Sequence, residues 1–115
     1  SETIINYNNS CFSFMYILGD QSSQINIFRK FYSKTTKTLE FSINNTIANE
    51  WKRQLVDLSQ SIDNYEIYVE GIVGSKQIAI DDLFLYTKTC QEVIDEEKEL
   101  NKQFRCKDGN LIPPE

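Results

Sequence analysis

Two adjacent carboxylates, Asp81 and Asp82, are the residues of this chain whose type and spacing are best suited to chemistry. They directly follow the apolar run 78–80, in a segment that would otherwise be buried. Ionised side chains are costly to bury alone, so the fold must pair them, hydrate them or provide a cation. Asp81 with Glu70 or Asp57 could also form the two-acid site of a glycosidase, but the spacing singles out no such pair.

The absence of histidine excludes most other catalytic and metal sites. The 115 residues of the chain include three cysteines and no histidine. Zinc centres and the Ser-His and Cys-His pairs of nucleophilic catalysis draw on imidazole, so most such constellations are excluded. We therefore expect a protein that is not an enzyme.

The odd number of cysteines predicts one disulfide and one cysteine whose partner lies outside the chain. Cys11 and Cys90 bracket the part of the sequence that has strand-like alternation. The alternative is three buried free thiols in a reducing compartment. The residues alone leave both interpretations open.

The formal charge of −5 is unevenly distributed along the chain. Residues 1–90 carry ten acids and eight bases, whereas residues 91–103 carry five acids and two bases. The first region has no basic patch for nucleic acid or anionic lipid, so we exclude both as partners. The longest unbroken apolar run, 14–18, is too short to span a membrane, and no secretory signal is present. A chain of this length buries one hydrophobic core.

Apolar and polar residues alternate from residue 11 to 86, with the period of strands that have one buried face. We predict six short strands, and hence an all-β antiparallel β-sandwich rather than alternating strands and helices. We expect Trp51 to anchor the core rather than to form a ligand platform. Tyr65 and Tyr68 fall on opposite strand faces, so one ring should be buried and the other exposed. The predicted strands are 11–18, 25–31, 38–43, 51–58, 65–70 and 78–85.

The alternation changes parity at the acid pair, because apolar residues occupy even positions before it and odd positions after it. A β-bulge, which adds one residue to the strand, would restore a common buried face. We predict this bulge, with Asp82 turned inward and hydrogen-bonded to backbone N–H groups. Asp81 should then face solvent.

Four segments of the chain resemble, in order, parts of a MAM domain, the extracellular β-sandwich module named for meprin, a neuropilin antigen and receptor phosphatase mu. Residues 11–16, 25–28, 51–58 and 69–83 match the family patterns C-L-x-F-x-Y, L-x-V-Y, W-x-x-x-x-V-D-L and E-G-x-x-G with I-A-[IL]-D-D-[IL]. The loop 74–77 is shorter than usual, and the family's N-terminal strands, with their first cysteine pair, are absent. The resemblance implies a jelly-roll-like sandwich of which residues 1–90 are the larger, C-terminal part.

The same resemblance implies a disulfide between Cys11 and Cys90 and a cation, often calcium, near Asp81 and Asp82. Calcium takes six to eight oxygen ligands, so we expect its site to be incomplete without the missing strands.

The function that the resemblance implies is that of a non-enzymatic recognition or adhesion module of a multidomain cell-surface or secreted protein. Its partners would be other ectodomain proteins or a second copy, and it would meet a membrane only through parts of the protein outside this chain. The alternatives are a carbohydrate-binding β-sandwich and an accessory domain of an extracellular protease.

The composition changes after Cys90. Residues 91–103 are acidic and helix-forming but have few apolar positions, so we predict a solvated linker. Residues 104–115 resemble the opening of an LDL-receptor class A repeat, with Leu111 at the family's second cysteine position. This second resemblance implies a truncated repeat in which Cys106 is the unpaired cysteine.

Asn8 and Asn44 each begin an Asn-x-Ser/Thr sequon without proline in the middle, and are candidate glycosylation sites in a secreted chain. Such triplets also arise by chance in an asparagine-rich sequence. Asn44 follows an alternating segment where an exposed turn is expected, so it is the better candidate.

Overall fold

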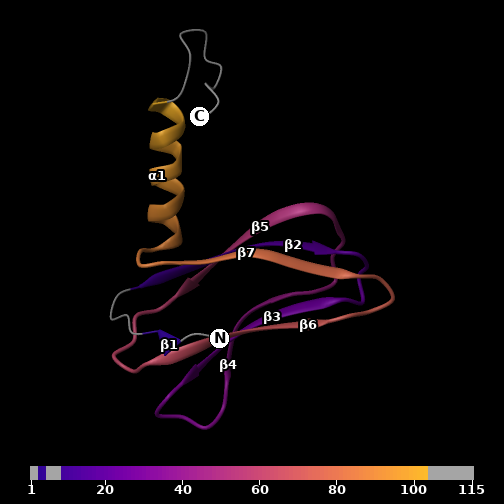
Figure 1. Ribbon diagram of the computed structural model, residues 1–115, viewed down its shortest axis with the longest axis horizontal. Helices are drawn as coiled ribbons and strands as arrows, with labels where there is room; N and C mark the ends of the chain where they lie inside the picture. The colour runs from indigo at the N-terminus through magenta and orange to yellow at the C-terminus, as the bar shows by residue number, and fades with distance from the viewer. Residues whose placement is uncertain (1–2, 5–8, 104–115) are drawn as a thin grey trace.

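The computed structural model describes residues 3–4 and 9–103, which form seven strands and one helix (Figure 1). The elements are β1 (Thr3–Ile4), β2 (Ser10–Leu18), β3 (Gln24–Phe31), β4 (Thr38–Ile43), β5 (Ala48–Leu58), β6 (Tyr65–Ile72), β7 (Ile78–Tyr86) and α1 (Cys90–Gln103). All six predicted strands are present. The additional strand, β1, is too short to produce a periodic pattern in the sequence.

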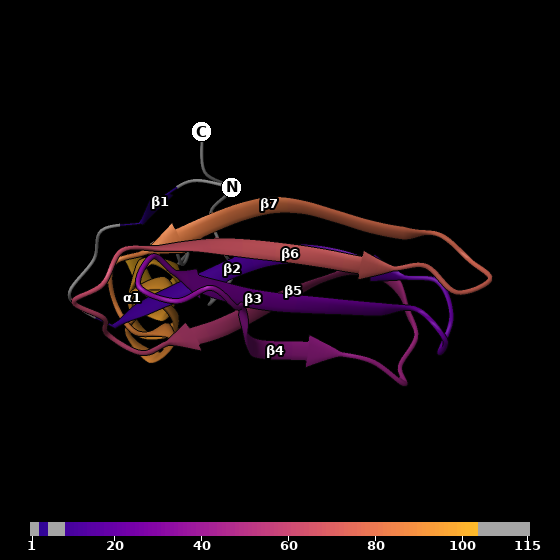
Figure 2. The same cartoon turned by 90° about the horizontal axis from the view of Figure 1, so that it is seen from below.

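The strands form two antiparallel sheets that lie face to face (Figures 1 and 2). One sheet has the strand order β1-β6-β3-β4 and the other the order β5-β2-β7. Figure 1 separates the two layers, with α1 standing beyond the end of the three-stranded sheet. The predicted antiparallel β-sandwich is therefore confirmed.

Strand β2 is the middle strand of the three-stranded sheet and contributes four side chains to the core. Successive side chains of a strand alternate between its two faces, so every second residue of β2 points inward. Phe12, Phe14, Tyr16 and Leu18 are all buried, as their spacing predicts. Burying each of these side chains stabilises the fold by about 1.5–3 kcal/mol relative to leaving it exposed. The buried residues packed with them are Ile25, Ile27, Ile43, Ala48, Val56, Leu58 and Tyr65.

The register of β5 overturns the expectation that Trp51 anchors the core. Val56 lies opposite Phe12, and Lys52 lies opposite Tyr16. Directly paired side chains point to the same face of a sheet, so the even positions of β5 face the core and Trp51 faces away from it. Trp51 is accordingly 48% exposed.

The two tyrosines of β6 differ in burial, in the direction that their opposite faces predict. Tyr65 is 1% exposed, within the core. Tyr68 is half-buried, because Lys37 Nζ lies 5.2 Å from the centre of its ring on the outer face.

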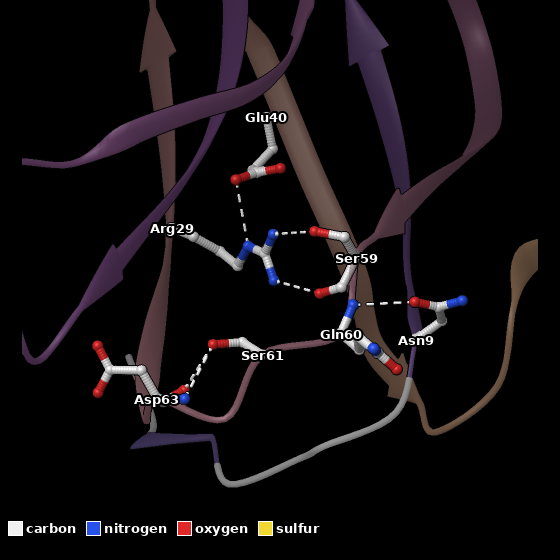
Figure 3. Close-up of polar contacts among 7 residues, drawn as sticks. All are labelled: Asn9, Arg29, Glu40, Ser59, Gln60, Ser61 and Asp63. Carbon is white, nitrogen blue, oxygen red and sulfur yellow. Dashed lines mark hydrogen bonds and ion pairs between the residues drawn. The ribbon is translucent and has the colours of Figure 1, made fainter.

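A buried arginine closes one end of the sandwich (Figure 3). Arg29 is 3% exposed, and its Nε donates a hydrogen bond of 3.1 Å to Glu40 Oε2. Its Nη1 and Nη2 donate to the carbonyl and hydroxyl oxygens of Ser59, at 2.8 and 3.1 Å. The guanidinium carbon also lies 4.9 Å from the ring centres of Phe31 and Tyr65. The buried charge is thus paired and hydrogen-bonded, as its burial requires.

At the opposite end, Asp20 links the connection between β2 and β3 to the connection between β6 and β7. Its carboxylate accepts hydrogen bonds from the backbone N–H of Ser22 at 2.7 Å, the hydroxyl of Ser75 at 2.8 Å and the backbone N–H of Lys76 at 2.6 Å. The hydroxyls of Ser22 and Ser75 hold the pKa of Asp20 well below its ordinary value. The two connections approach so closely that a Cβ on Gly74 would lie 1.9 Å from Ser22 Oγ, so a larger residue here would displace Ser22 from Asp20.

The first turn of α1 packs against the three-stranded sheet. Thr89 and Glu92 form a reciprocal capping box, with two hydrogen bonds of 3.1 Å, and the Thr89 N–H and hydroxyl lower the pKa of Glu92. Val93 is 2% exposed and packs near Leu55. Residues 91–103 are helical, as their composition suggests, but the first turn of this predicted solvated linker is packed against the sheet. Val93 is enough to dock this turn, because the Cys11–Cys90 disulfide and the capping box already fix the position of the helix start.

Candidate functional site

The acid pair lies at the predicted β-bulge. Along the pairing of β2 with β7, Ser13 lies opposite Phe84 and Met15 lies opposite Asp81. Two residues of β7 therefore face one residue of β2, and the register shifts at that point. Asp82 has a φ of 55°, in the left-handed region that aspartate tolerates better than most residues. The bulge is confirmed.

The prediction that Asp82 turns inward is wrong, whereas Asp81 faces solvent as expected. Both Asp81 and Asp82 are exposed. The carboxylate that accepts a backbone hydrogen bond belongs to Asp81, whose Oδ1 receives the N–H of Asp82 at 2.8 Å. The left-handed backbone at the bulge turns the extra residue outward, so neither charge has to be buried.

Trp51 and the acid pair border the same hollow on the outer face of the three-stranded sheet. The hollow has a volume of about 310 Å³ and is lined by Met15, Trp51, Asp81 and Asp82. Met15 lies on the central strand, opposite Asp81 on β7 and Arg53 on β5. The site thus combines an aromatic plate, a thioether and two carboxylates. Trp51 lines this hollow because the odd positions of β5 point outward. The prediction that Trp51 lies in the core did not include it among the site residues.

Arg53 lies beside this hollow but is engaged elsewhere. Its Nη1 forms an ion pair with Glu97 Oε1 at 2.7 Å, and its Nε donates to Ser13 Oγ at 3.1 Å. Its Nη2 donates to Tyr86 Oη at 3.4 Å, and the Glu97 carboxylate raises the pKa of Arg53. Among the residues that the structure describes, Asp81 and Asp82 have no ion pair.

The hollow does not fit the calcium site that the resemblance implies. Calcium requires six to eight oxygen ligands, and two adjacent carboxylates supply too few. Within residues 3–4 and 9–103, no group of three or more acidic, cysteine or histidine side chains could hold a metal ion.

The acids considered for a glycosidase-like pair are not brought together. Glu70 lies in the four-stranded sheet, where its Oε1 accepts a hydrogen bond from Asn26 at 2.9 Å. Asp57 lies opposite Cys11, four residues along β2 from the partner of Asp81. Four residues of strand span about 13 Å, which exceeds the carboxylate separation that glycosidases use.

A disulfide joins β2 to the start of α1. Cys11 and Cys90 have an S–S distance of 2.08 Å and a Cα–Cα distance of 4.9 Å, and they are the pair that the resemblance implies. Both are buried, with Val93, Leu55 and Tyr86 around them. The backbone N–H of Cys90 donates to Asp57 Oδ1 at 2.9 Å, so this carboxylate positions the helix start.

The remaining candidate sites are the two glycosylation sequons and the third cysteine. Asn44 is exposed in the connection between β4 and β5, next to Asn45 with its φ of 53°, and remains a predicted glycosylation site. Asn8 lies outside the described residues. So do Cys106 and the whole stretch 104–115 that resembles an LDL-receptor class A repeat.

Two face-to-face antiparallel sheets, tied to a following helix by a disulfide, define a β-sandwich module of the kind found outside cells. A family model described as MAM domain, meprin/A5/mu, matches residues 1–91, and the chain belongs to this family. No solved structure was found to match the chain.

Family membership sets the general biology of the chain. MAM domains are extracellular adhesion-type modules of multidomain proteins, and in general they are not catalytic. They occur in extracellular or membrane-anchored proteins, a location that suits the disulfide. Among the described residues, the only helix is too short and too polar to cross a bilayer.

Proposed function

We propose that this chain is a non-enzymatic recognition module that mediates protein–protein contacts within a multidomain cell-surface or secreted protein. The observation that carries the proposal is the match to the MAM family over residues 1–91, which cover the entire sandwich. The outer face of the three-stranded sheet supports it, because Trp51 and Phe84 are 48% and 57% exposed there. Exposed aromatic side chains are enriched at protein interfaces.

The partner is another ectodomain protein or a second copy of this chain. The charge balance over residues 1–90 supports this choice, since nucleic acid and anionic membranes both require a basic surface. Any membrane attachment comes from parts of the protein outside this chain. In an extracellular protein, the sequons at Asn8 and Asn44 would carry N-linked glycans.

Binding to a panel of surface proteins tests this function. The complete ectodomain is displayed on beads, and both capture of panel members and bead aggregation are measured. The proposal expects a saturable partner or self-aggregation, lost when the reduced and alkylated protein is used. An ectodomain that stays monomeric and captures no panel member at micromolar concentration would contradict it.

A second candidate function, carbohydrate binding, is favoured by one observation. The exposed indole of Trp51 lies beside two hydrogen-bond acceptors, an arrangement that also suits the stacking of a sugar ring. A glycan array with wild-type protein and Trp51→Leu separates the two functions, since only a lectin would show array signal that depends on Trp51. A third role, as accessory domain of an extracellular protease, requires a protease domain elsewhere in the same protein.

A further inference from the structure

We propose that the hollow between Trp51 and the bulge at Asp81–Asp82 receives an arginine side chain of a partner protein. The inference rests on the proposed function, in that the partner is a protein, and adds the chemistry by which it is recognised. Its elements are the exposed indole, the two carboxylates that lack an ion pair, and the hollow of about 310 Å³ that they share.

Charge complementarity identifies the occupant. Carboxylates are acceptors only, and the other lining groups are the Met15 thioether and the Trp51 indole. A ligand that satisfies this lining must therefore donate hydrogen bonds and carry positive charge. A sugar hydroxyl meets the first condition but not the second.

No cation of the chain itself takes this place among the described residues. Arg53, which is paired with Met15 across the sheet, is bound to Glu97, Ser13 and Tyr86. Lys52 lies on the opposite face of β5, because it is paired with the core residue Tyr16.

Arginine fits better than lysine. Its planar guanidinium can stack on the face of an indole while its N–H groups reach carboxylates at the edge. A lysine ammonium is a strongly hydrated point charge and offers no flat surface to the aromatic ring. The wide opening of the hollow suits a side chain presented by another protein rather than an enclosed small molecule.

The chain carries its own two reporters for a test. Trp51 is its only tryptophan and Met15 its only methionine, and both line the hollow. The 115-residue chain is titrated with the blocked peptide Gly-Arg-Gly, while indole fluorescence and the ¹³C-labelled methionine methyl signal are followed. The matched ligand is Gly-citrulline-Gly, which keeps the shape of arginine without its charge. We expect a saturable response to the arginine peptide and a response at least about threefold weaker to the citrulline peptide.

Variants separate the pocket from bulk charge. Asp81→Asn with Asp82→Asn should weaken the arginine peptide about fivefold to tenfold, and Trp51→Leu, followed by the Met15 methyl, about two- to fivefold. Asparagine accepts the left-handed backbone at position 82, so the double variant retains the bulge. The control is Asp95→Asn, an exposed carboxylate on α1, which should leave binding unchanged. Salt titration of the wild type tests the electrostatic contribution as a whole, because binding should weaken as ionic strength rises.

Three results would overturn the inference: equal binding of the citrulline peptide, unchanged binding by the double variant, or an equal loss in Asp95→Asn. Its failure can be told apart from failure of the proposed function. If the ectodomain binds its partner equally well with Asp81→Asn and Asp82→Asn, the recognition function is supported and the arginine pocket is contradicted. If no protein partner exists, the function falls whatever the peptide does.

Discussion

The carboxylate of Asp20 accepts a hydrogen bond of 2.6 Å from the backbone N–H of Lys76, 56 residues further along the chain. The same side chain accepts bonds from Ser22 and Ser75. It therefore joins two connections, each of which crosses between the two sheets, through an acceptor that works fully only when it is ionised.

This arrangement predicts the acid sensitivity of the fold. The folded-state pKa of Asp20 lies below its ordinary value of 3.8, so its contribution to the free energy of unfolding is complete above that value. The contribution is lost as the pH falls below 3.8 toward the folded-state pKa. Asp20→Asn should therefore lower the melting temperature at pH 7, and the wild-type and variant curves should approach each other steadily as the pH falls from 3.8 toward the folded-state pKa. Parallel curves across the acid range would contradict this role.

The left-handed backbone at the bulge predicts an unusual order of stability at position 82. Asp82→Ala should lower the free energy of unfolding by about 1 kcal/mol, because alanine lacks the short polar side chain with which aspartate tolerates the left-handed region. Asp82→Gly and Asp82→Asn should be neutral or slightly stabilising. Urea unfolding of the three variants provides the measurement. A glycine variant less stable than the alanine variant would show that the side chain, not the backbone, matters here.

The buried ion pair should be costly to break. Arg29→Met removes one partner and leaves Glu40, with a side chain only 16% exposed, without its cation. We expect a loss of about 3–5 kcal/mol, and partial recovery when Glu40→Leu is added. The matched control is Arg53→Met, whose ion pair with Glu97 is 34% and 43% exposed and should be worth less than about 1 kcal/mol. Equal losses in the two variants would argue against a special role for Arg29.

The disulfide should contribute through the loop that it closes. Cys11 and Cys90 are 79 residues apart, and a loop of this length removes about 4–5 kcal/mol of chain entropy from the unfolded state. Cys11→Ser with Cys90→Ser should reduce the free energy of unfolding by an amount of this order, measured in denaturant against the oxidised protein. A loss below about 1 kcal/mol would mean that docking of α1 through Val93 holds the helix without the covalent link.

Alternation along each segment determined most of the architecture, because a strand at the surface of one core must place every second residue inward. The six strands, the core face of β2 and the bulge at Asp81–Asp82 all follow from this local rule and could be predicted. The resemblance added the MAM family, and it pointed to the cysteine pair that the structure joins.

The tertiary structure alone decided which long-range neighbours each face meets. The exposure of Trp51 depends on the register between β5 and β2, the ion pair of Arg29 on the approach of Glu40 and Ser59, and the bonds of Asp20 on the meeting of two loops. The positions of the two carboxylates depended on a left-handed residue that alternation cannot reveal. Local periodicity reports only which side of a strand a residue occupies. The partner on that side is set by contacts between residues far apart in the chain.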